Sequence, residues 1–126
     1  MTQTLAEAQE QGIAPWENAD IVVKTRHFVV FWDGYPVTYG HTLFVPVTDT
    51  WQDATECWKA AYRWGYEWQN NGFCDAFNLG MNVGEAAGQT VMYPHVHLIP
   101  RRTDDCENPA GGVRHCAPHD NAYYKK

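Results

Sequence analysis

The sequence predicts an α+β fold in which short strands form an antiparallel sheet beside one long helix. Five short segments are rich in β-branched and aromatic residues or alternate in polarity, and turn residues separate most of them. Neighbouring strands joined by a short turn pair antiparallel. Between the third and fourth segments, aromatic and small residues recur at spacings of three and four, which indicates a helix.

The five predicted strands span residues 20–24, 26–32, 41–47, 75–82 and 91–101. Only Thr25 separates the first two. Either the turn between them is very tight, or the first strand is short and irregular. Asp33-Gly34 is a turn signal after the second strand, and residues 84–88 form a glycine-bounded turn before the last one.

Two helices are predicted. Residues 3–12 are strong helix formers closed by Gly12 and should form a short helix. A long helix should run from about Trp51 to Asn70, after several N-cap residues and before Asn71-Gly72. Its apolar stripe should pack on the sheet or at a subunit interface. The stripe consists of Trp51, Ala54, Trp58, Ala61, Trp64 or Gly65, and Trp68.

The chain length of 126 residues suits a single domain with a modest core. Within this domain, residues 1–15 form an N-terminal helix or arm, and residues 104–126 form a turn-rich C-terminal tail. Trp16 should pack onto the body of the domain as an anchor. The four cysteines show no C-x-x-C pairing, so we expect free thiols.

Composition narrows the function. Hydrophobic residues make up 44% of the chain and charged residues 19%, which is typical of a globular protein. The net charge of -6 argues against bulk nucleic acid as a partner but not against a small anionic substrate. No segment approaches the ~20 apolar residues of a membrane span. The N-terminus does not resemble a signal peptide, so we expect a cytoplasmic protein that is not bound to membranes.

Two histidines stand out in residues 88–102. In an extended strand, Tyr93, His95 and His97 share one face, since successive side chains alternate. Such a pair of imidazoles suits metal binding or attack on an electrophile such as phosphorus, or the two rings are simply solvated. The flanking Gln89-Thr90 offers an amide and a hydroxyl that hold phosphate oxygens without adding charge, which favours a phosphate substrate.

The same residues carry a family resemblance. Asn82-x-Gly84-x-x-x-Gly88-Gln89-Thr90-Val91, followed by His95-Val96-His97-Leu98-Ile99-Pro100-Arg101, resembles the histidine-triad (HIT) family of nucleotide hydrolases and transferases. The resemblance extends upstream through residues 28–46 and downstream to residues 111–114. One position departs from the family pattern: Tyr93, followed by Pro94, replaces the first histidine. Tyr93 still carries the main-chain carbonyl that orients the middle histidine in the family, but an imidazole is lost.

The resemblance implies a five-stranded antiparallel sheet with one long helix, and a homodimer. It also implies a reaction. His95 would attack the α-phosphorus of a nucleotide conjugate, either a dinucleoside polyphosphate or a nucleoside phosphoramidate. A covalent nucleotidyl-histidine would form, and water would release the nucleoside monophosphate. Neither a cofactor nor a metal is expected.

The resemblance also assigns roles to single residues. Asp33 would hold the ribose hydroxyls, and Asn82 and His97 would hold the non-bridging oxygens. His41 would back the histidines, and Arg114 would reach the phosphates of a long substrate or form a surface salt bridge. The predicted catalytic residues are His95, His97, His41 and Gln89, and the predicted nucleotide-binding residues are Asp33, Asn82, Gly88, Thr90, Tyr93 and Arg114. For Tyr93, a hydrogen bond from the phenol toward the leaving group is a further possibility.

Two alternatives remain open from the sequence. The first is a nucleotide-binding module without turnover, which keeps Asp33 and the phosphate loop but lacks a complete triad. The second is a zinc site formed by His41, His95 and His97, because three histidines can bind zinc and leave one position open.

Overall fold

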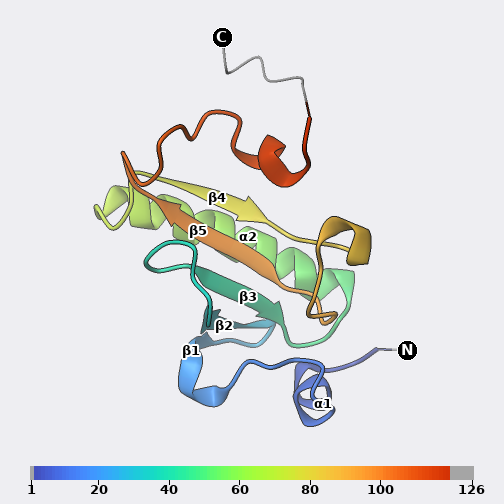
Figure 1. Ribbon diagram of the computed structural model, residues 1–126. Helices are drawn as coiled ribbons and strands as arrows, with labels where there is room; N and C mark the ends of the chain where they lie inside the picture. The colour runs from blue at the N-terminus through green and yellow to red at the C-terminus, as the bar shows by residue number, and fades with distance from the viewer. Residues whose placement is uncertain (1, 120–126) are drawn as a thin grey trace.

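The computed structural model describes residues 2–119, and these form an α+β fold with a five-stranded antiparallel sheet and one long helix (Figure 1). The strand order is β1-β2-β3-β5-β4, so β1 and β4 are the edges. The predicted fold class is confirmed. The strands are β1 (Ile21–Lys24), β2 (Phe28–Trp32), β3 (Thr42–Pro46), β4 (Ala76–Gly80) and β5 (Val96–Arg101), and the helices are α1 (Leu5–Glu10) and α2 (Trp51–Asn70).

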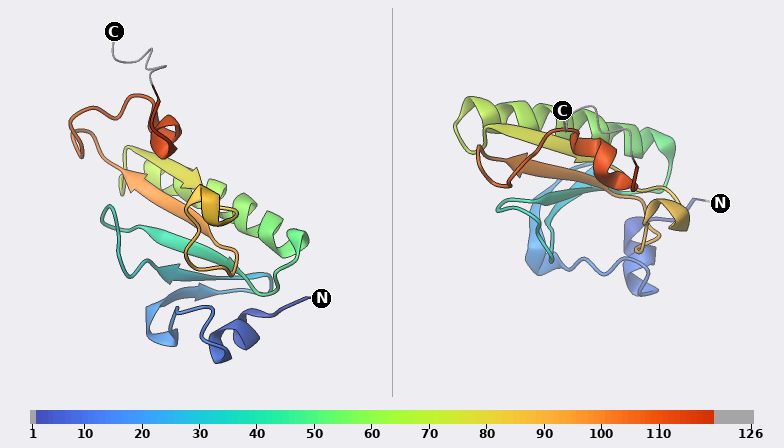
Figure 2. Two further views of the ribbon diagram at one scale, coloured as in Figure 1. Left: turned by 45° about the vertical axis from the view of Figure 1, so that its right-hand side comes forward. Right: turned by 45° about the horizontal axis from the view of Figure 1, so that its top comes forward.

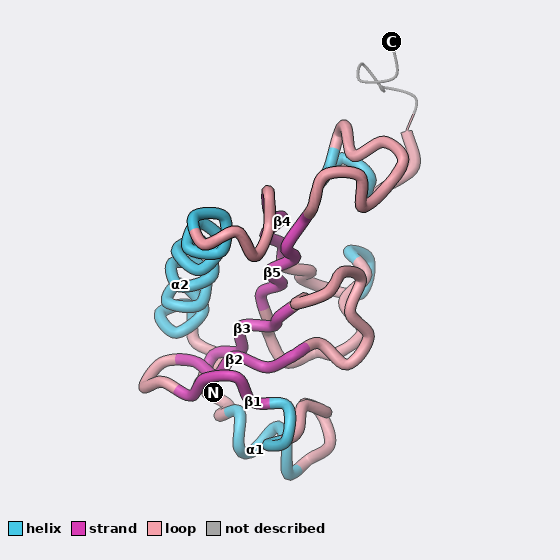
Figure 3. The backbone as a smooth tube through the Cα atoms, turned by 90° about the vertical axis from the view of Figure 1, so that its left-hand side faces the viewer, coloured by secondary structure: helices cyan, strands magenta, loops and turns pink. Residues whose placement is uncertain are grey.

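The long helix α2 covers one face of the sheet, and most loops and short 3-10 turns lie on the other (Figure 3). Thr50 caps its N-terminus by accepting a hydrogen bond from the Asp53 amide. Its fully buried residues are Cys57, Ala61 and Gly65, which recur every fourth position. These small residues let the helix lie close to the sheet, and a Cβ at Gly65 would stand 2.6 Å from the Phe77 ring.

Part of the predicted stripe of α2 packs on the sheet, and the rest is exposed, where a subunit interface stays a prediction. Ala61 and Trp64 pack against the core, as does Trp68. Trp51, however, is 73% exposed and Trp58 is 38% exposed. The small side chains of α2 pack directly on the sheet. The helix is therefore rotated so that the bulky rings at the N-terminal end of the stripe face away from the sheet.

A second core lies on the opposite face of the sheet. Odd-numbered residues of β2 and β3 point to this side, and α1 packs over them with Leu5 and Ala8. A capping box at Thr4 and Glu7 starts α1, and the Leu5 amide donates to the Val47 carbonyl at 2.8 Å. In both views of Figure 2, α1 lies at the β1 side of the molecule and the C-terminal turn lies at the β4 side.

The last predicted strand begins later than expected. Residues 91–95 are irregular, and β5 starts only at Val96. Pro94 has no amide hydrogen and could not donate to a ladder there. The described part of the predicted C-terminal tail, residues 104–119, turns back after β5 and forms a 3-10 turn, η3 (Gly112–Cys116), that packs beside β4. The remainder of that prediction, residues 120–126, lies outside the described residues. Across the part of the chain that the structure describes, no helix combines the length and apolarity needed to cross a membrane.

Candidate active site

Two loops and the strand β5 bring three histidines together on the face opposite α2. His41 ends the loop between β2 and β3, and His97 lies in β5, whose partner across the sheet is Leu43. The Nε2 atom of His41 and the Nδ1 atom of His97 are 2.9 Å apart. His95 directly precedes β5, and its ring centroid is 5.1 Å from that of His97. The structure therefore brings the three predicted histidines into one cluster.

The main chain fixes the tautomer of His95. Its Nδ1 atom is 2.9 Å from the carbonyl oxygen of Tyr93, in a buried position. A carbonyl only accepts hydrogen bonds, so Nδ1 carries the hydrogen and Nε2 keeps its lone pair. The orienting hydrogen bond that the family resemblance implies is thus in place with tyrosine at position 93. This hydrogen bond leaves the Nε2 atom of His95 with a lone pair that can attack an electrophile.

A second chain of hydrogen bonds fixes the other two imidazoles. The Val37 amide donates to Nδ1 of His41 at 3.2 Å, so the hydrogen of His41 resides on Nε2. That Nε2–H then donates to Nδ1 of His97, which leaves the hydrogen of His97 on its own Nε2. His97 is therefore a donor at the nitrogen that His41 does not contact. One lone pair and one donor, on neighbouring rings, suit attack on a phosphate whose oxygens need hydrogen bonds.

Burial keeps this pair of rings neutral. It lowers the pKa of His97 from 6.5 to about 4, with further lowering by His95 and His41, while the Asp33 carboxylate opposes the change. Burial also lowers the pKa of His41, again opposed by Asp33. Both rings are uncharged near neutral pH. A phosphate at this site would be held by N–H donors and not by imidazolium charge.

Asp33 lies beside the histidines at the start of the same loop. One carboxylate oxygen accepts from the Tyr35 amide at 2.7 Å, and the other lies 3.3 Å from Nε2 of His41. Asp33 thus caps its own turn, as an Asp-Gly turn requires, and also contacts the histidine cluster. Its side chain is 14% exposed, so a ligand can still reach it.

Asp33, His41 and His97 also have the donor set of a metal site, since one ligand atom from each lies within 4.8 Å of the others. The set differs from the predicted zinc ligands, because Asp33 takes the place of His95. The Val37 amide argues against metal binding here. A metal on Nε2 of His41 would move the hydrogen of that ring to Nδ1, where it would face the Val37 N–H. The residues fit a hydrogen-bonded chain better than a metal centre.

Residues 81–95 connect β4 to β5 and contain the predicted glycine-bounded turn; we call them the phosphate loop, and Gln89 holds this loop closed. Its Oε1 accepts from the Gly84 amide at 2.8 Å, and its Nε2 donates to the carbonyls of Val91 and Met92 at 3.0 and 3.1 Å. Gly88 has a φ of 90°, a left-handed conformation that favours glycine. The side-chain amide of Gln89 is thus used within the loop. Three other predicted ligands, Asn82, Gly88 and Thr90, are exposed on it.

The side chain of Tyr93 does not have its predicted place. It is only 1% exposed and belongs to the core under α1, and its hydroxyl donates to the Pro46 carbonyl at 2.7 Å. Burial raises the pKa of this phenol. The expectation that the phenol donates toward a leaving group is therefore wrong: its hydrogen is committed to the main chain of β3. Arg114, by contrast, is exposed on η3 in the C-terminal tail.

Two contacts at the site have no signal in the sequence. The Trp16 ring packs edge-on against His95, with centroids 5.1 Å apart, and stacks on Phe31 at 5.9 Å. Trp16 is an anchor, as predicted, but its contact with His95 joins residues 79 positions apart along the chain. The Val37 amide is a main-chain group, and no residue type announces its role.

This arrangement has relatives. Residues 16–104 match the model of the HIT domain. The chain is 33% identical over 81 residues to adenylylsulfatase HINT3 of Arabidopsis thaliana, covering 59% of this chain and 41% of that protein. It is 35% identical over 80 residues to bis(5'-adenosyl)-triphosphatase of Dictyostelium discoideum, covering 58% and 54% respectively. This chain thus spans about half or less of each of these relatives.

Solved structures show the same fold. A zinc-bound histidine triad family protein from Mycobacterium smegmatis superposes with a TM-score of 0.64 at 29% identity, over 78% of this chain and 74% of that one. A HIT family protein from Bacillus anthracis gives a TM-score of 0.59 at 33% identity, over 68% and 65%. The family model covers most of the chain, and the chain belongs to the HIT domain family.

Proposed function

We propose that this protein cleaves nucleotide conjugates at the α-phosphate through a covalent nucleotidyl-histidine on His95, and releases a nucleoside monophosphate. One observation carries the proposal: the Tyr93 carbonyl holds the Nδ1 hydrogen of His95, so that Nε2 presents a lone pair. Two HIT relatives, an adenylylsulfatase and a bis(5'-adenosyl)-triphosphatase, carry names of enzymes that act on adenine nucleotide conjugates, which supports the same class of substrate.

The reaction divides into two displacements. In the first, the Nε2 lone pair of His95 forms a bond to the α-phosphorus, and the bond to the leaving group breaks with its electron pair; an amine leaving group takes up a proton from solvent as it departs. In the second, water adds to phosphorus and gives up a proton to solvent, and the bond to Nε2 breaks with its electron pair returning to the ring. The Nε2–H of His97 and donors of the phosphate loop, with Asn82 and Thr90 among them, would hold the non-bridging oxygens as charge develops on them. Asp33 would accept hydrogen bonds from the ribose hydroxyls.

The experiment follows AMP release from diadenosine tetraphosphate and from adenosine 5'-phosphoramidate. The wild type should release AMP, and His95→Ala should release none above background. His27→Ala is the matched control, because His27 is an exposed histidine whose ring contacts Asp53, away from the cluster. Mass spectrometry of denatured reaction mixtures should show an adenylyl adduct on the wild type alone. Binding of AMP with neither release nor adduct would overturn the proposal and support a nucleotide-binding module.

We also propose that two copies of the chain pair through the β4 edge and the outer face of α2. Tyr62 and Tyr66 on α2 pack edge-on against each other with ring centroids 5.0 Å apart, and both are exposed. With Trp58 and Leu79 they line a shallow apolar groove beside β4. Exposed aromatic rings next to an edge strand are typical of an interface. A homodimer is also what the family resemblance implies.

A further inference from the structure

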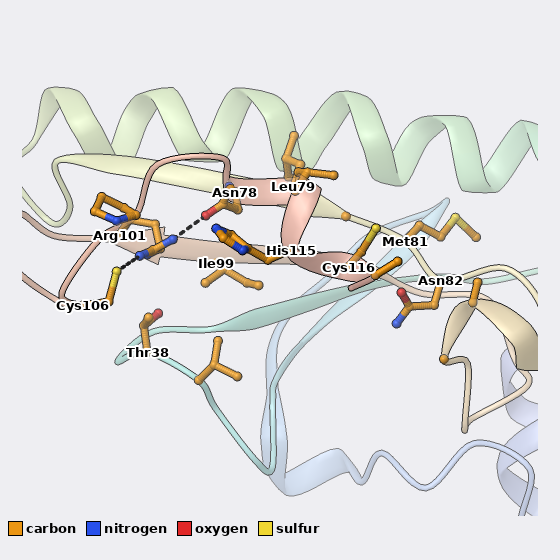
Figure 4. Close-up of a pocket in the computed structure, with 18 of the residues that line it drawn as sticks. Thr38, Asn78, Leu79, Met81, Asn82, Ile99, Arg101, Cys106, His115 and Cys116 are labelled. Atoms are coloured by element: carbon orange, nitrogen blue, oxygen red, sulfur yellow. Dashed lines mark hydrogen bonds between the residues drawn. The ribbon is translucent and has the colours of Figure 1, made fainter. Parts of the chain in front are cut away.

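A groove follows the sheet away from the histidines. Its cavity volume is about 1070 Å³, and it lies between the loop after β2 and the C-terminal turn η3 (Figure 4). Ile99 and Asn78, which are paired across β5 and β4, form part of its floor. One end reaches Asn82 and Gly88 of the phosphate loop, and the other reaches Arg101.

The groove is placed to receive whatever is attached to the phosphorus. His97 and Ile99 share one face of β5, because residues two apart in a strand point to the same side. In the sheet order, Asp33 follows β2 on one side of the histidines, whereas the groove lies over β5 and β4 on the other. A ribose held by Asp33 and a phosphate at His95 would therefore leave the groove for the departing group.

We propose that this groove binds the leaving group and selects one that is neutral and largely apolar over a polyphosphate chain. This inference rests on the proposed function. It narrows the substrate to conjugates such as phosphoramidates of apolar amines, in which phosphorus carries a group without negative charge.

The charges in the groove support this choice. Among the described residues that line the groove, Arg101 is the one lysine or arginine, and it is already paired. Its Nε and Nη2 atoms donate to the two carboxylate oxygens of Asp105, each at 2.8 Å, and its Nη1 atom donates to Asn78 Oδ1 at 2.9 Å. The bidentate pair has no net charge. On the described part of the lining a polyphosphate would find no unpaired lysine or arginine, and it would approach the Asp105 carboxylate in a chain of net charge -6.

The apolar groups of the groove support the same choice. Val37 on one wall and Val113 on the other are 69% and 68% exposed. Ile99 lies half-buried on the floor between them. An apolar leaving group would remove all three side chains from water, which is favourable in proportion to the area covered. The side-chain amides of Asn78 and Asn82 can form hydrogen bonds with a polar substituent on the leaving group.

The test uses three substrates that share the adenosine 5'-phosphoryl group and differ only in what leaves. They are the unsubstituted phosphoramidate, the N-benzyl phosphoramidate and diadenosine tetraphosphate. For the wild type, kcat/KM should be about tenfold higher for the benzyl compound than for either of the others, as expected for one buried apolar group. Equal values, or a preference for the tetraphosphate, would overturn the inference while leaving the proposed function intact.

Two variants make the test specific for the groove. Ile99→Arg places an unpaired cation on the floor, so the benzyl-to-unsubstituted ratio should fall at least tenfold and the tetraphosphate should gain. Ile99→Met keeps an apolar floor and should keep the wild-type ratio. A ratio that Ile99→Arg does not move would contradict the inference. If no substrate is cleaved, the proposed function fails. The groove is then tested by calorimetric Kd values of the same three compounds with His95→Ala, where the same ratios are expected and equal Kd values would overturn it.

Discussion

The hydroxyl of Tyr93 donates to the main-chain carbonyl of Pro46, and the carbonyl of the same tyrosine accepts the Nδ1 hydrogen of His95. One residue therefore connects the interior of β3 to the proposed nucleophile. The family resemblance implies an imidazole at this position, and the phenol present here has a structural part. We expect the identity of this side chain to affect stability more than catalysis.

Tyr93→Phe tests this division. The substitution leaves the buried Pro46 carbonyl without its donor, so the free energy of unfolding should fall by about 1–2 kcal/mol. The Tyr93 carbonyl is unaffected, and kcat for AMP release should change less than threefold at 25 °C. Urea unfolding and initial rates are the measurements. A large loss of turnover in a variant of unchanged stability would show that the phenol acts in the reaction.

His97 should make stability depend on pH. Its pKa is about 4 in the folded protein and 6.5 in the unfolded chain, so the unfolded chain binds more protons between these values. Stability should be highest above pH 6.5, and it should decline as pH falls toward 4. The shift corresponds to about 3 kcal/mol, and His41 adds to it in the same direction.

Urea unfolding between pH 4 and 7 should therefore show a steeper decline for the wild type than for His97→Gln, which cannot take up the proton. His115→Gln, in the exposed tail, is the control and should retain the wild-type slope. Identical slopes for the wild type and His97→Gln would contradict the assignment.

Gln89 should control the shape of the phosphate loop. Gln89→Glu keeps an acceptor for the Gly84 amide but loses the donors to the Val91 and Met92 carbonyls, and it brings a negative charge next to them. Hydrogen exchange of amides 84–92 should speed up, and kcat/KM should fall at least tenfold. Gln52→Glu, which makes the same change at an exposed position of α2, should alter neither. Unchanged exchange in Gln89→Glu would show that the loop is held by other contacts.

Arg102 holds the loop between β2 and β3 from the far end. Its Nη1 donates to the Tyr39 carbonyl at 2.6 Å, its Nη2 donates to the Phe73 carbonyl at 2.9 Å, and its guanidinium carbon lies 4.8 Å from the Phe73 ring centroid. A lysine cannot span both carbonyls or stack in this way. Arg102→Lys should lower the free energy of unfolding by about 1–2 kcal/mol. It should also lower kcat, since His41 follows this segment directly. Arg26→Lys, at an exposed position, is the matched control.

The proposed dimer is tested by charge on the outer face of α2. Tyr62→Glu places a carboxylate in the apolar groove beside β4 and should convert a dimer into a monomer, as measured by light scattering on a sizing column. Tyr35→Glu is the control, because Tyr35 is a fully exposed tyrosine on a different loop. A wild type that is monomeric at micromolar concentration would contradict the proposal.

Local patterns were enough to predict the sheet and the long helix. The predicted helix from about Trp51 to Asn70 coincides with α2, because its N-cap and its Asn-Gly end are both local signals. The buried face of α2 could not be predicted from local signals. The Phe77 ring, on strand β4, fills the space beside Gly65, and this contact sets the rotation of the helix.

The site follows the same rule. His41, His95 and His97 were found because their residue types and spacing resemble a family pattern. Two contacts were not predicted: the hydrogen bond from Tyr93 to Pro46 and the ring contact of Trp16 with His95. The partners lie 47 and 79 positions apart along the chain, respectively. Contacts of this kind depend on the folded arrangement, and a single sequence does not display them.

The Val37 amide fixes the positions of the hydrogens on His41 and His97 before any ligand binds. A main-chain N–H has no second protonation state near neutral pH, so the order Val37, His41, His97 is established once the loop closes during folding. Between the pKa of His97 and alkaline pH, this order does not change. A bound phosphate would therefore find His41 and His97 already in this order, with no proton to take up or release on either ring.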